Sequence, residues 1–209
     1  MPNHMTSPPS ILIVYAHPAS HLSHVNKRML EHVRDLPNVR VHDLYQTYPD
    51  FYIDVAREQA LLEESDLIVL QHPVQWYSMP GLLKEWIDAV FEHGWAYGRE
   101  GRALRGKDIW LVASTGSPAG AYQPGGSHRR HFSDFLPPYE QTAHLCGMRW
   151  LPPLIVHGSR RDDAAEIEPM AAQYRKRLID YPSWSQAIST RADEDPITPE
   201  VQPEDPHDQ

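Results

Sequence analysis

Three loops hold most of the side chains in this sequence that could bind a ligand or move a proton. The first loop, residues 16–26, combines hydroxyl, imidazole and amide groups immediately before a helical pattern. Side-chain donors, backbone N–H groups and the positive end of a helix dipole together favour an anion. We therefore expect this loop to bind a phosphate monoester. Its polar residues are His17, Ser20, His21, Ser23, His24 and Asn26.

Two other interpretations of the first loop remain open. His17, His21 and His24 are close enough in sequence to suggest a metal site, but no cysteine or carboxylate joins them, so we predict no metal. Ser23 and Asn26 could instead do no more than cap the following helix. The sequence contains neither Gly-x-Gly-x-x-Gly nor Gly-Lys-Ser/Thr, so neither a Rossmann dinucleotide loop nor a P-loop is indicated.

The second loop, residues 71–80, follows an apolar run and precedes a helical pattern. Pro73 and Pro80 stiffen it, and Trp76 and Tyr77 stand side by side within it. The two aromatic rings could form one wall of a slot for a flat ring, with backbone amides at the edge of that ring. Alternatively, both rings cover a local part of the hydrophobic core.

The third loop, residues 114–128, is rich in small residues, which allow the backbone to approach a ligand closely. It also carries a phenol, Tyr122, and an imidazole, His128, six positions apart. Both groups can donate hydrogen bonds and transfer protons, so they are candidates for catalysis. The alternative is a flexible surface loop without a catalytic role.

An alternation of strands and helices must position these loops. Apolar runs predict strands at residues 11–16, 39–44, 66–70, 108–113 and 150–156, and the prolines of the last suit only an edge or a strand entry. Helical patterns cover residues 25–36, 54–64, 80–92 and 162–179, and a mixed helical stretch ends near residue 146. This alternation predicts an α/β fold with helices on both faces of a five-stranded parallel sheet, in the flavodoxin-like order 2-1-3-4-5. In that order the three loops meet at one edge of the sheet, where ligands bind.

Composition limits the classes of protein that this chain can belong to. Its 209 residues carry a formal charge of −9, which argues against broad binding to nucleic acid or to anionic membranes. No apolar run approaches the ~20 residues needed to span a bilayer, and the single cysteine, Cys146, fits a reducing cytosol. We expect a cytoplasmic protein with a disordered lead at residues 1–9, which lacks a signal-peptide core, one domain at 10–181, and a disordered, acidic, proline-rich tail at 182–209.

Several ordered motifs across residues 10–180 resemble the flavodoxin-like NAD(P)H:quinone oxidoreductase family. They are Tyr15-Ala16-His17-Pro18, Ser23-His24-x-Asn26, Gln71-His72-Pro73-x-Gln75-Trp76-Tyr77, Leu83-Lys84-x-Trp86-Ile87-Asp88 and Ser114-Thr115-Gly116. Within that family, other motifs are similar to the ancillary subunits of glutathione-regulated potassium-efflux systems. They include Asp43-Leu44-Tyr45, Tyr48-Pro49-Asp50-Phe51, Arg57-Glu58-Gln59 and His93-Gly94-Trp95-Ala96-Tyr97-Gly98.

The resemblance implies a noncovalently bound FMN, with NADH or NADPH as the electron donor. The residues that would contact its phosphate and ribityl segment are His17, Ser23, His24, Val25 and Asn26. Those that would form the wall beside the isoalloxazine ring are Pro73, Val74, Gln75, Trp76 and Tyr77, and those over its polar edge are Ser114, Thr115, Gly116 and Ser117. Ser117 stands where the family often has a second glycine. Tyr122 and His128 match a tyrosine–histidine pair that assists hydride and proton transfer.

We therefore predict a cytosolic FMN enzyme that passes hydride from NAD(P)H to a quinone or a related electrophile. A different class of function also fits, a regulatory subunit docked on a membrane potassium/proton antiporter, and a one-electron carrier is a third interpretation. We also expect a homodimer, because the helix after the second loop carries more apolar residues than one sheet-facing stripe needs; the alternative is a thick core helix. Those residues are Leu82, Leu83, Trp86, Ile87, Val90 and Phe91.

Overall fold

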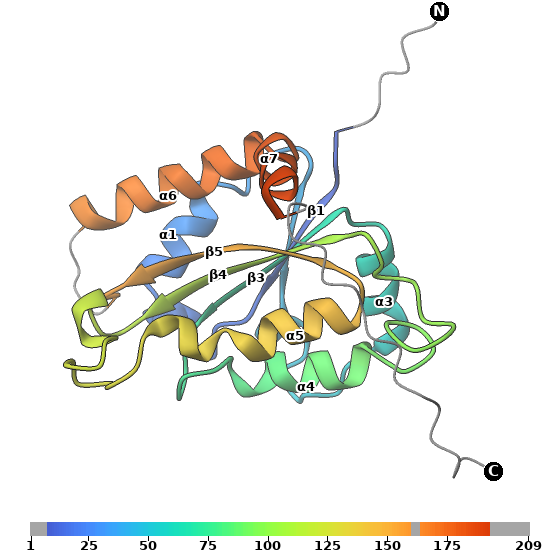
Figure 1. Ribbon diagram of the computed structural model, residues 1–209, viewed down its shortest axis with the longest axis horizontal. Helices are drawn as coiled ribbons and strands as arrows, with labels where there is room; N and C mark the ends of the chain where they lie inside the picture. The colour runs from blue at the N-terminus through green and yellow to red at the C-terminus, as the bar shows by residue number, and fades with distance from the viewer. Residues whose placement is uncertain (1–7, 160–163, 193–209) are drawn as a thin grey trace, which may run out of the picture.

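The computed structural model describes residues 8–159 and 164–192, which fold around a five-stranded sheet covered by helices on both faces (Figure 1). All strand pairs are parallel, and the strands lie in the order β2-β1-β3-β4-β5. The strands are β1 (Ile11–Tyr15), β2 (Val39–Asp43), β3 (Leu67–Pro73), β4 (Asp108–Thr115) and β5 (Arg149–His157). The predicted fold class and strand order are confirmed.

The three central strands are buried along almost their whole length. Every residue of β1 and β4 is buried, and so is every residue of β3 except its last, Pro73. Such strands have helices against both faces, so their sequences are continuously apolar rather than alternating. Pro152 and Pro153 lie in β5, which is the edge strand that their missing N–H groups require.

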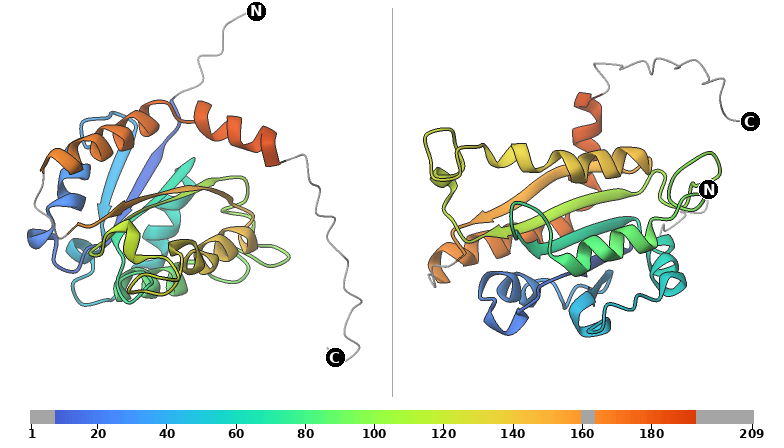
Figure 2. Two further views of the ribbon diagram at one scale, coloured as in Figure 1. Left: turned by 60° about the vertical axis from the view of Figure 1, so that its left-hand side comes forward. Right: turned by 90° about the horizontal axis from the view of Figure 1, so that it is seen from below.

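The helices form one layer on each face of the sheet, as the turned views show (Figure 2). One layer contains α1 (Val25–Glu31), α6 (Ala164–Ile179) and α7 (Ser183–Ala192). The other contains α2 (Leu44–Thr47), α3 (Val55–Glu63), α4 (Gly81–Val90) and α5 (Pro137–Leu145). Short 3₁₀ turns occur at Ser20–Leu22, Ala119–Ala121 and Phe132–Phe135. None of the described helices combines the length and the apolar character that a membrane span requires.

The helix predicted over residues 25–36 is shorter than expected and ends at Glu31. The residues after it form turns up to Leu36, which precedes Pro37. A proline disfavours helical backbone in the residue before it, so the chain leaves the helix before this point. The ends of α3 agree with the sequence: Asp54, the predicted acidic cap, accepts a hydrogen bond from the Arg57 backbone N–H (3.1 Å).

The apolar residues of α4 belong to the chain's own core. Leu82, Leu83, Trp86 and Val90 are completely buried, and Ile87 packs against the same cluster. The excess of apolar residues in this helix is therefore explained by a thick core helix, the alternative stated above, and it no longer argues for a dimer.

Helix α7 corrects the prediction of a disordered tail beginning at residue 182. Trp184 packs on the buried Trp110, with ring centroids 5.3 Å apart. Ser185 is completely buried and accepts a hydrogen bond from Arg149 (3.0 Å). The composition of this segment was misleading because one tryptophan and one buried hydroxyl are enough to dock it on the sheet. Residues 1–7 and 193–209, the rest of the two predicted disordered ends, lie outside the described residues.

A chain that ends at Tyr181 should be less stable than one that ends at Ala192. Removing α7 strips the Trp184 ring from Trp110 and takes a partner from Arg149, which we expect to lower the free energy of unfolding by about 2–4 kcal/mol. Urea unfolding of the two truncated chains measures the difference. Equal stabilities would mean that α7 only rests on the surface.

Candidate active site

The carboxyl ends of β1, β3 and β4 bring the first loop and the neighbouring strand ends together around a hollow of about 350 Å³. We call it the central hollow; it is lined by His17, Leu22, Ser23, His24, Val25, Asn26, Pro73, Ser114 and Ser159. In Figure 1 the arrowheads of the strands point toward this end of the sheet. The phosphate-side residues predicted from the sequence therefore line one hollow together with one residue from each of the other two loops, Pro73 and Ser114.

Asn26 connects the first loop to the third across the central hollow. Its backbone N–H donates to Ser23 Oγ (3.2 Å), and its side-chain Nδ2 donates to Ser114 Oγ (2.8 Å). Its Oδ1 is buried and has no hydrogen-bond partner among the residues that the structure describes. Buried polar atoms in proteins are nearly always hydrogen bonded, so an acceptor left over beside a hollow is a mark of a ligand site.

The charges beside the central hollow come from residues that the sequence analysis did not select. A neighbouring hollow of about 320 Å³ shares Ser23 and His24 with it and is lined also by Lys27 and Arg28. Burial lowers the pKa of His17 below its ordinary value, which keeps that imidazole neutral at pH 7. Arg28 is ion-paired with Glu31 and Glu168, which line the same hollow, so Lys27, directly after the predicted motif, supplies the positive charge at this end of the site.

The second loop makes a tight turn whose tip is two aromatic residues. Gln75 and Ser78 exchange two backbone hydrogen bonds of 3.0 Å, and Trp76 and Tyr77 between them have φ angles of 47° and 67°. Glycine, asparagine and aspartate are the usual residues at such positions, and bulky side chains there store about 1–3 kcal/mol of strain each. Strain of this kind is concentrated at functional sites.

The side chains of the two aromatic residues of this turn lie in different environments. Tyr77 contacts the third loop: its ring centroid lies 5.6 Å from that of His128 and 5.0 Å from that of Phe135. Trp76 is 93% exposed and is not placed against any of the other predicted site residues. Tyr77 thus contacts the third loop, while the predicted wall formed by Trp76 and Tyr77 stays a prediction. Neither ring covers the core, which was the alternative interpretation.

Replacing Trp76 by glycine should stabilise the fold while weakening flavin binding. Glycine adopts a φ of 47° without strain, so the free energy of unfolding should rise by up to about 1 kcal/mol. Loss of the ring should weaken flavin affinity by about 1–3 kcal/mol if Trp76 closes on the ring system. Fluorescence titration and urea unfolding on the same protein measure both; unchanged affinity would remove Trp76 from the site.

The third loop is built around a packed aromatic cluster and is not a free surface loop. Tyr122 is 9% exposed, and its ring stacks on His128 with centroids 4.2 Å apart and an angle of 16°. Phe132 meets the other side of the cluster, 5.3 Å from Tyr122 and edge-on to it. The tyrosine and histidine predicted from the sequence are therefore in direct contact. Their catalytic role stays a prediction.

His157, which the sequence analysis missed, fixes the loop after β4. Thr115 Oγ1 donates to the Ser117 carbonyl (2.8 Å), and His157 Nδ1 lies 2.9 Å from the same hydroxyl oxygen. A hydroxyl has one proton and a carbonyl can only accept, so His157 Nδ1 must carry a proton and donate it to Thr115. Burial lowers the pKa of His157, so the ring is neutral at pH 7 and its Nε2 carries a lone pair.

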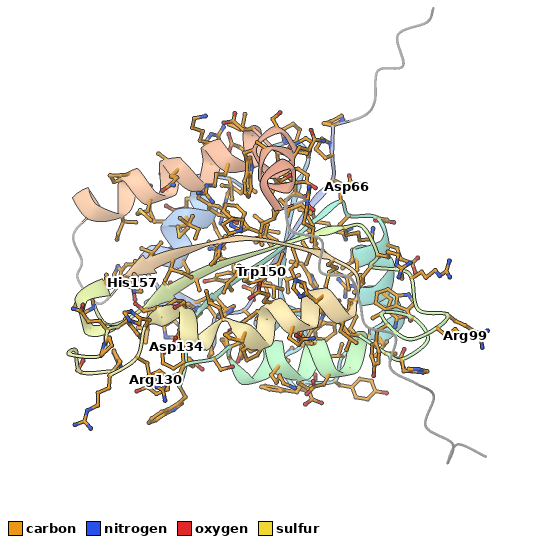
Figure 3. All side chains as sticks on the ribbon, viewed as in Figure 1. Asp66, Arg99, Arg130, Asp134, Trp150 and His157 are labelled. Carbon is orange, nitrogen blue, oxygen red and sulfur yellow. The ribbon has the colours of Figure 1, made fainter. Side chains whose placement is uncertain are left out.

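The end of β5 holds the same loop through its backbone as well. Gly158 N–H donates to the Ser117 carbonyl (2.9 Å), and Ser159 N–H donates to the Thr115 carbonyl (2.8 Å). Figure 3 shows His157 at this end of the sheet. A polar residue at the carboxyl end of the fifth strand was the signal that could have identified His157.

His72, which precedes the turn of the second loop, is buried and held in place by its neighbours. It is completely buried, and its Nδ1 donates to the Pro73 carbonyl (2.9 Å). Its ring stacks with Tyr139, whose hydroxyl lies 3.4 Å from Nε2. Burial lowers the pKa of His72 to about 4, so the ring is neutral at physiological pH.

Metal ligation finds no support in the described part of the chain, where no three histidine, cysteine, aspartate or glutamate side chains come together as a ligand set. Hydrogen-bonding and proton-transferring groups dominate instead: hydroxyls, imidazoles and an amide at the central hollow, and a stacked phenol and imidazole on the loop that leaves it at Ser114. The groups at the hollow can bind a phosphorylated or hydroxyl-bearing ligand, and the phenol and imidazole can transfer protons.

A family model described by its flavodoxin-like fold matches residues 9–178 of the chain. Among solved structures, a thermophilic tryptophan halogenase from Streptomycin violaceusniger is 42% identical, over 80% of this chain and 97% of that chain, with a TM-score of 0.77. General stress protein 14 from Treponema denticola, solved in complex with FMN, is 40% identical, over 81% and 98% of the two chains, with a TM-score of 0.76. An NADPH-quinone reductase from P. pentosaceus is 32% identical, over 80% and 96%, with a TM-score of 0.72.

The family match covers all but the last three residues of the domain predicted at 10–181, and it confirms the resemblance that the loop motifs carried. The similarity to the potassium-efflux subgroup within the family stays a prediction. The chain belongs to the flavodoxin-like family that includes an FMN-binding stress protein and an NADPH-quinone reductase.

Proposed function

We propose that this protein is an FMN-dependent oxidoreductase that transfers hydride from NAD(P)H to quinones or related electrophiles. One observation carries the proposal: the stacked Tyr122–His128 pair lies on the loop that follows Ser114, which itself lines the central hollow. The FMN bound by one relative and the quinone reductase activity named for another support the same cofactor and reaction.

The residues at the central hollow fit FMN by their chemistry. Ser23, His24 and Ser114 can donate to phosphate or hydroxyl oxygens, Lys27 adds positive charge, and the leftover Oδ1 of Asn26 can accept from a hydroxyl. When bound, FMN supplies the two-electron chemistry that links a nicotinamide to an acceptor, and the protein supplies binding and orientation.

Tyr122 and His128 have the proton chemistry that quinone reduction requires. Hydride transfer to a quinone leaves a negative oxygen, which a phenol or an imidazole can stabilise by a hydrogen bond and then protonate. Tyr77 packs against His128, and Phe135 packs against Tyr77. The two proton donors, Tyr122 and His128, therefore lie among aromatic rings that exclude water. A flat acceptor would stack on the same rings.

A purified sample tests the proposal directly. It should be yellow, or should quench the fluorescence of added FMN at micromolar concentration, and the loaded protein should oxidise NADH or NADPH when benzoquinone is present. A protein that neither contains nor binds FMN would overturn the proposal.

A regulatory role on a membrane potassium/proton antiporter is a second candidate, and the motifs shared with the efflux ancillary subunits favour it. Co-expression with a glutathione-gated potassium antiporter should then raise potassium efflux. Efflux that a variant unable to bind FMN still activates would assign regulation to the folded subunit rather than to turnover. No change in efflux with either form would leave the reductase as the function.

Assembly as a homodimer is supported by exposed aromatic side chains rather than by α4. Trp76 and Tyr52 are almost fully exposed, and Phe51, whose φ is 65°, is half exposed. Phe51 packs edge-on against Tyr45, which also contacts the start of α4 through Leu82. Analytical ultracentrifugation should give about twice the mass of one chain, and replacing both Trp76 and Tyr52 by serine should weaken the association.

A further inference from the structure

A chain of hydrogen bonds between buried side chains runs beneath the central hollow, from α6 to the first and third loops. The Tyr174 hydroxyl donates to Gln71 Oε1 (3.1 Å), and Gln71 Nε2 donates to the backbone carbonyl of Asn26 (3.1 Å). Asn26 Nδ2 then donates to Ser114 Oγ (2.8 Å). Each of these four residues is at most 2% exposed. We call this chain the buried relay.

The direction of the buried relay follows from its end groups. The Asn26 carbonyl can only accept, so Gln71 must turn its Nε2 toward it and its Oε1 toward Tyr174. Burial raises the pKa of Tyr174 well above its ordinary value, so the phenol stays protonated and can donate. Only one orientation of the Gln71 amide satisfies both contacts.

The side chains around the buried relay are apolar, so the polar groups of the relay need an explanation other than packing. Tyr174 lies in the cluster of Ile11, Val69 and Val112, where a methionine or phenylalanine would also fill space. Burying an amide and a phenol costs free energy that their hydrogen bonds only offset, so packing alone does not call for them. What the relay adds is a fixed position for Asn26.

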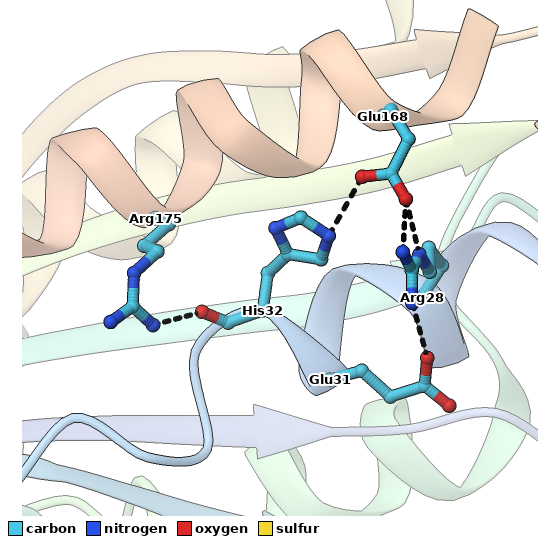
Figure 4. A network of polar contacts seen from close by, with 5 residues as sticks. All are labelled: Arg28, Glu31, His32, Glu168 and Arg175. Atoms are coloured by element: carbon cyan, nitrogen blue, oxygen red, sulfur yellow. Dashed lines mark hydrogen bonds and ion pairs between the residues drawn. The ribbon is translucent and has the colours of Figure 1, made fainter. Parts of the chain in front are cut away.

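Helix α6 also contacts α1 at the surface through ion pairs and hydrogen bonds (Figure 4). The two helices are therefore connected both by these surface contacts and by the buried relay. Glu168 accepts from Arg28 Nε (2.7 Å) and pairs with His32 (2.8 Å). Arg175 donates to the His32 carbonyl and pairs with Asp35. Asn26 is the second residue of α1, so the surface ion pairs and the buried relay together fix the side of the hollow that Asn26 forms.

We infer that Gln71 and Tyr174 are positioning residues that hold Asn26 and Ser114 for recognition of a polyol chain, which on the proposed function is the ribityl segment of FMN. Ser114 Oγ accepts from Asn26 and therefore keeps its own proton to donate, while Asn26 Oδ1 can only accept. An alcohol hydroxyl both donates and accepts, so it satisfies both groups at once. An ionised phosphate has no proton to offer Oδ1, which places phosphate elsewhere, toward Ser23 and His24.

Three flavins separate the ribityl contribution from the others. FMN has ring, ribityl chain and phosphate; riboflavin lacks the phosphate; lumiflavin lacks both chain and phosphate. The relay variants are Tyr174→Phe, which keeps the ring packed on Trp110, and Gln71→Met, which keeps the volume. Tyr48→Phe is the matched control, because it removes the hydroxyl of another buried tyrosine, one bonded to Glu58 rather than to the relay. Thermal unfolding of each apoprotein shows that it is folded.

Both relay variants should weaken FMN and riboflavin by about 5- to 30-fold, the scale of one or two lost hydrogen bonds. Lumiflavin affinity should stay within about twofold of wild type, and Tyr48→Phe should change none of the three affinities. The effect of Tyr174→Phe should also disappear in an Asn26→Ala background, since the relay acts through Asn26.

Other patterns overturn the inference. Equal losses for all three flavins, the same losses in Tyr48→Phe, or unchanged FMN and riboflavin binding would reduce the relay to general packing. A loss confined to FMN would assign Asn26 to the phosphate. If wild type binds none of the three flavins, the proposed function fails and this inference with it, an outcome distinct from wild-type binding with unaffected variants.

Discussion

Replacing Tyr122 by phenylalanine or His128 by glutamine should slow quinone reduction by about 10- to 1,000-fold while leaving FMN content unchanged. Each substitution removes one hydrogen-bond donor from the place where negative charge develops on the acceptor. The stacked contact of 4.2 Å between the two rings makes them a unit, so the double variant should lose less than the sum of the two single effects.

Stopped-flow measurement of the two half-reactions checks this expectation. Reduction of the loaded protein by NAD(P)H and its reoxidation by benzoquinone are followed separately, and the second step should carry the larger loss. Tyr52→Phe removes an exposed phenol outside the aromatic cluster and serves as the control. Wild-type rates in both steps would assign Tyr122 and His128 to packing of the loop.

Lowering the pH from 7.5 to 4.5 should destabilise wild type by about 2–3 kcal/mol more than a His72→Gln variant. The folded protein resists protonation of His72 until about pH 4, whereas the unfolded chain takes up that proton near the ordinary value of 6.5. The unfolded state therefore binds more protons throughout this window, and the free energy of unfolding falls as the pH falls through it. Well above pH 6.5 the imidazole is neutral in both states, so His72 contributes no pH dependence there.

Urea unfolding of the two proteins at several pH values measures this difference. The comparison with His72→Gln matters because burial also lowers the pKa values of His17 and His157, which add a slope common to both proteins. Glutamine keeps an acceptor for Tyr139 and cannot titrate. Parallel pH profiles for the two proteins would contradict the burial that the structure gives to His72.

Local sequence determined the sheet of this protein and the edge at which its site forms. The runs Ile11–Tyr15 and 109–113 are apolar without interruption because both faces of a central parallel strand are covered, a requirement that needs no knowledge of the partners. The prolines of β5 likewise indicated an edge strand, because an interior strand needs the backbone N–H groups that proline lacks. Strand order then placed the three unusual loops together.

Contacts between residues distant in sequence decided the rest. His157 and Ser159 belong to the site because β5 lies beside β4; the local sequence marks His157 only as a polar residue at a strand end and does not reveal its contact with Thr115. The burial of Trp184 on Trp110 gives α7 a place on the sheet that the polar composition of the tail concealed. Gln71 and Tyr174 acquire a role only when α6 brings a phenol 103 positions along the chain to the amide that holds Asn26. A hydrogen bond depends on where two groups meet in space, and that meeting is fixed by packing of whole elements rather than by the local pattern of either one.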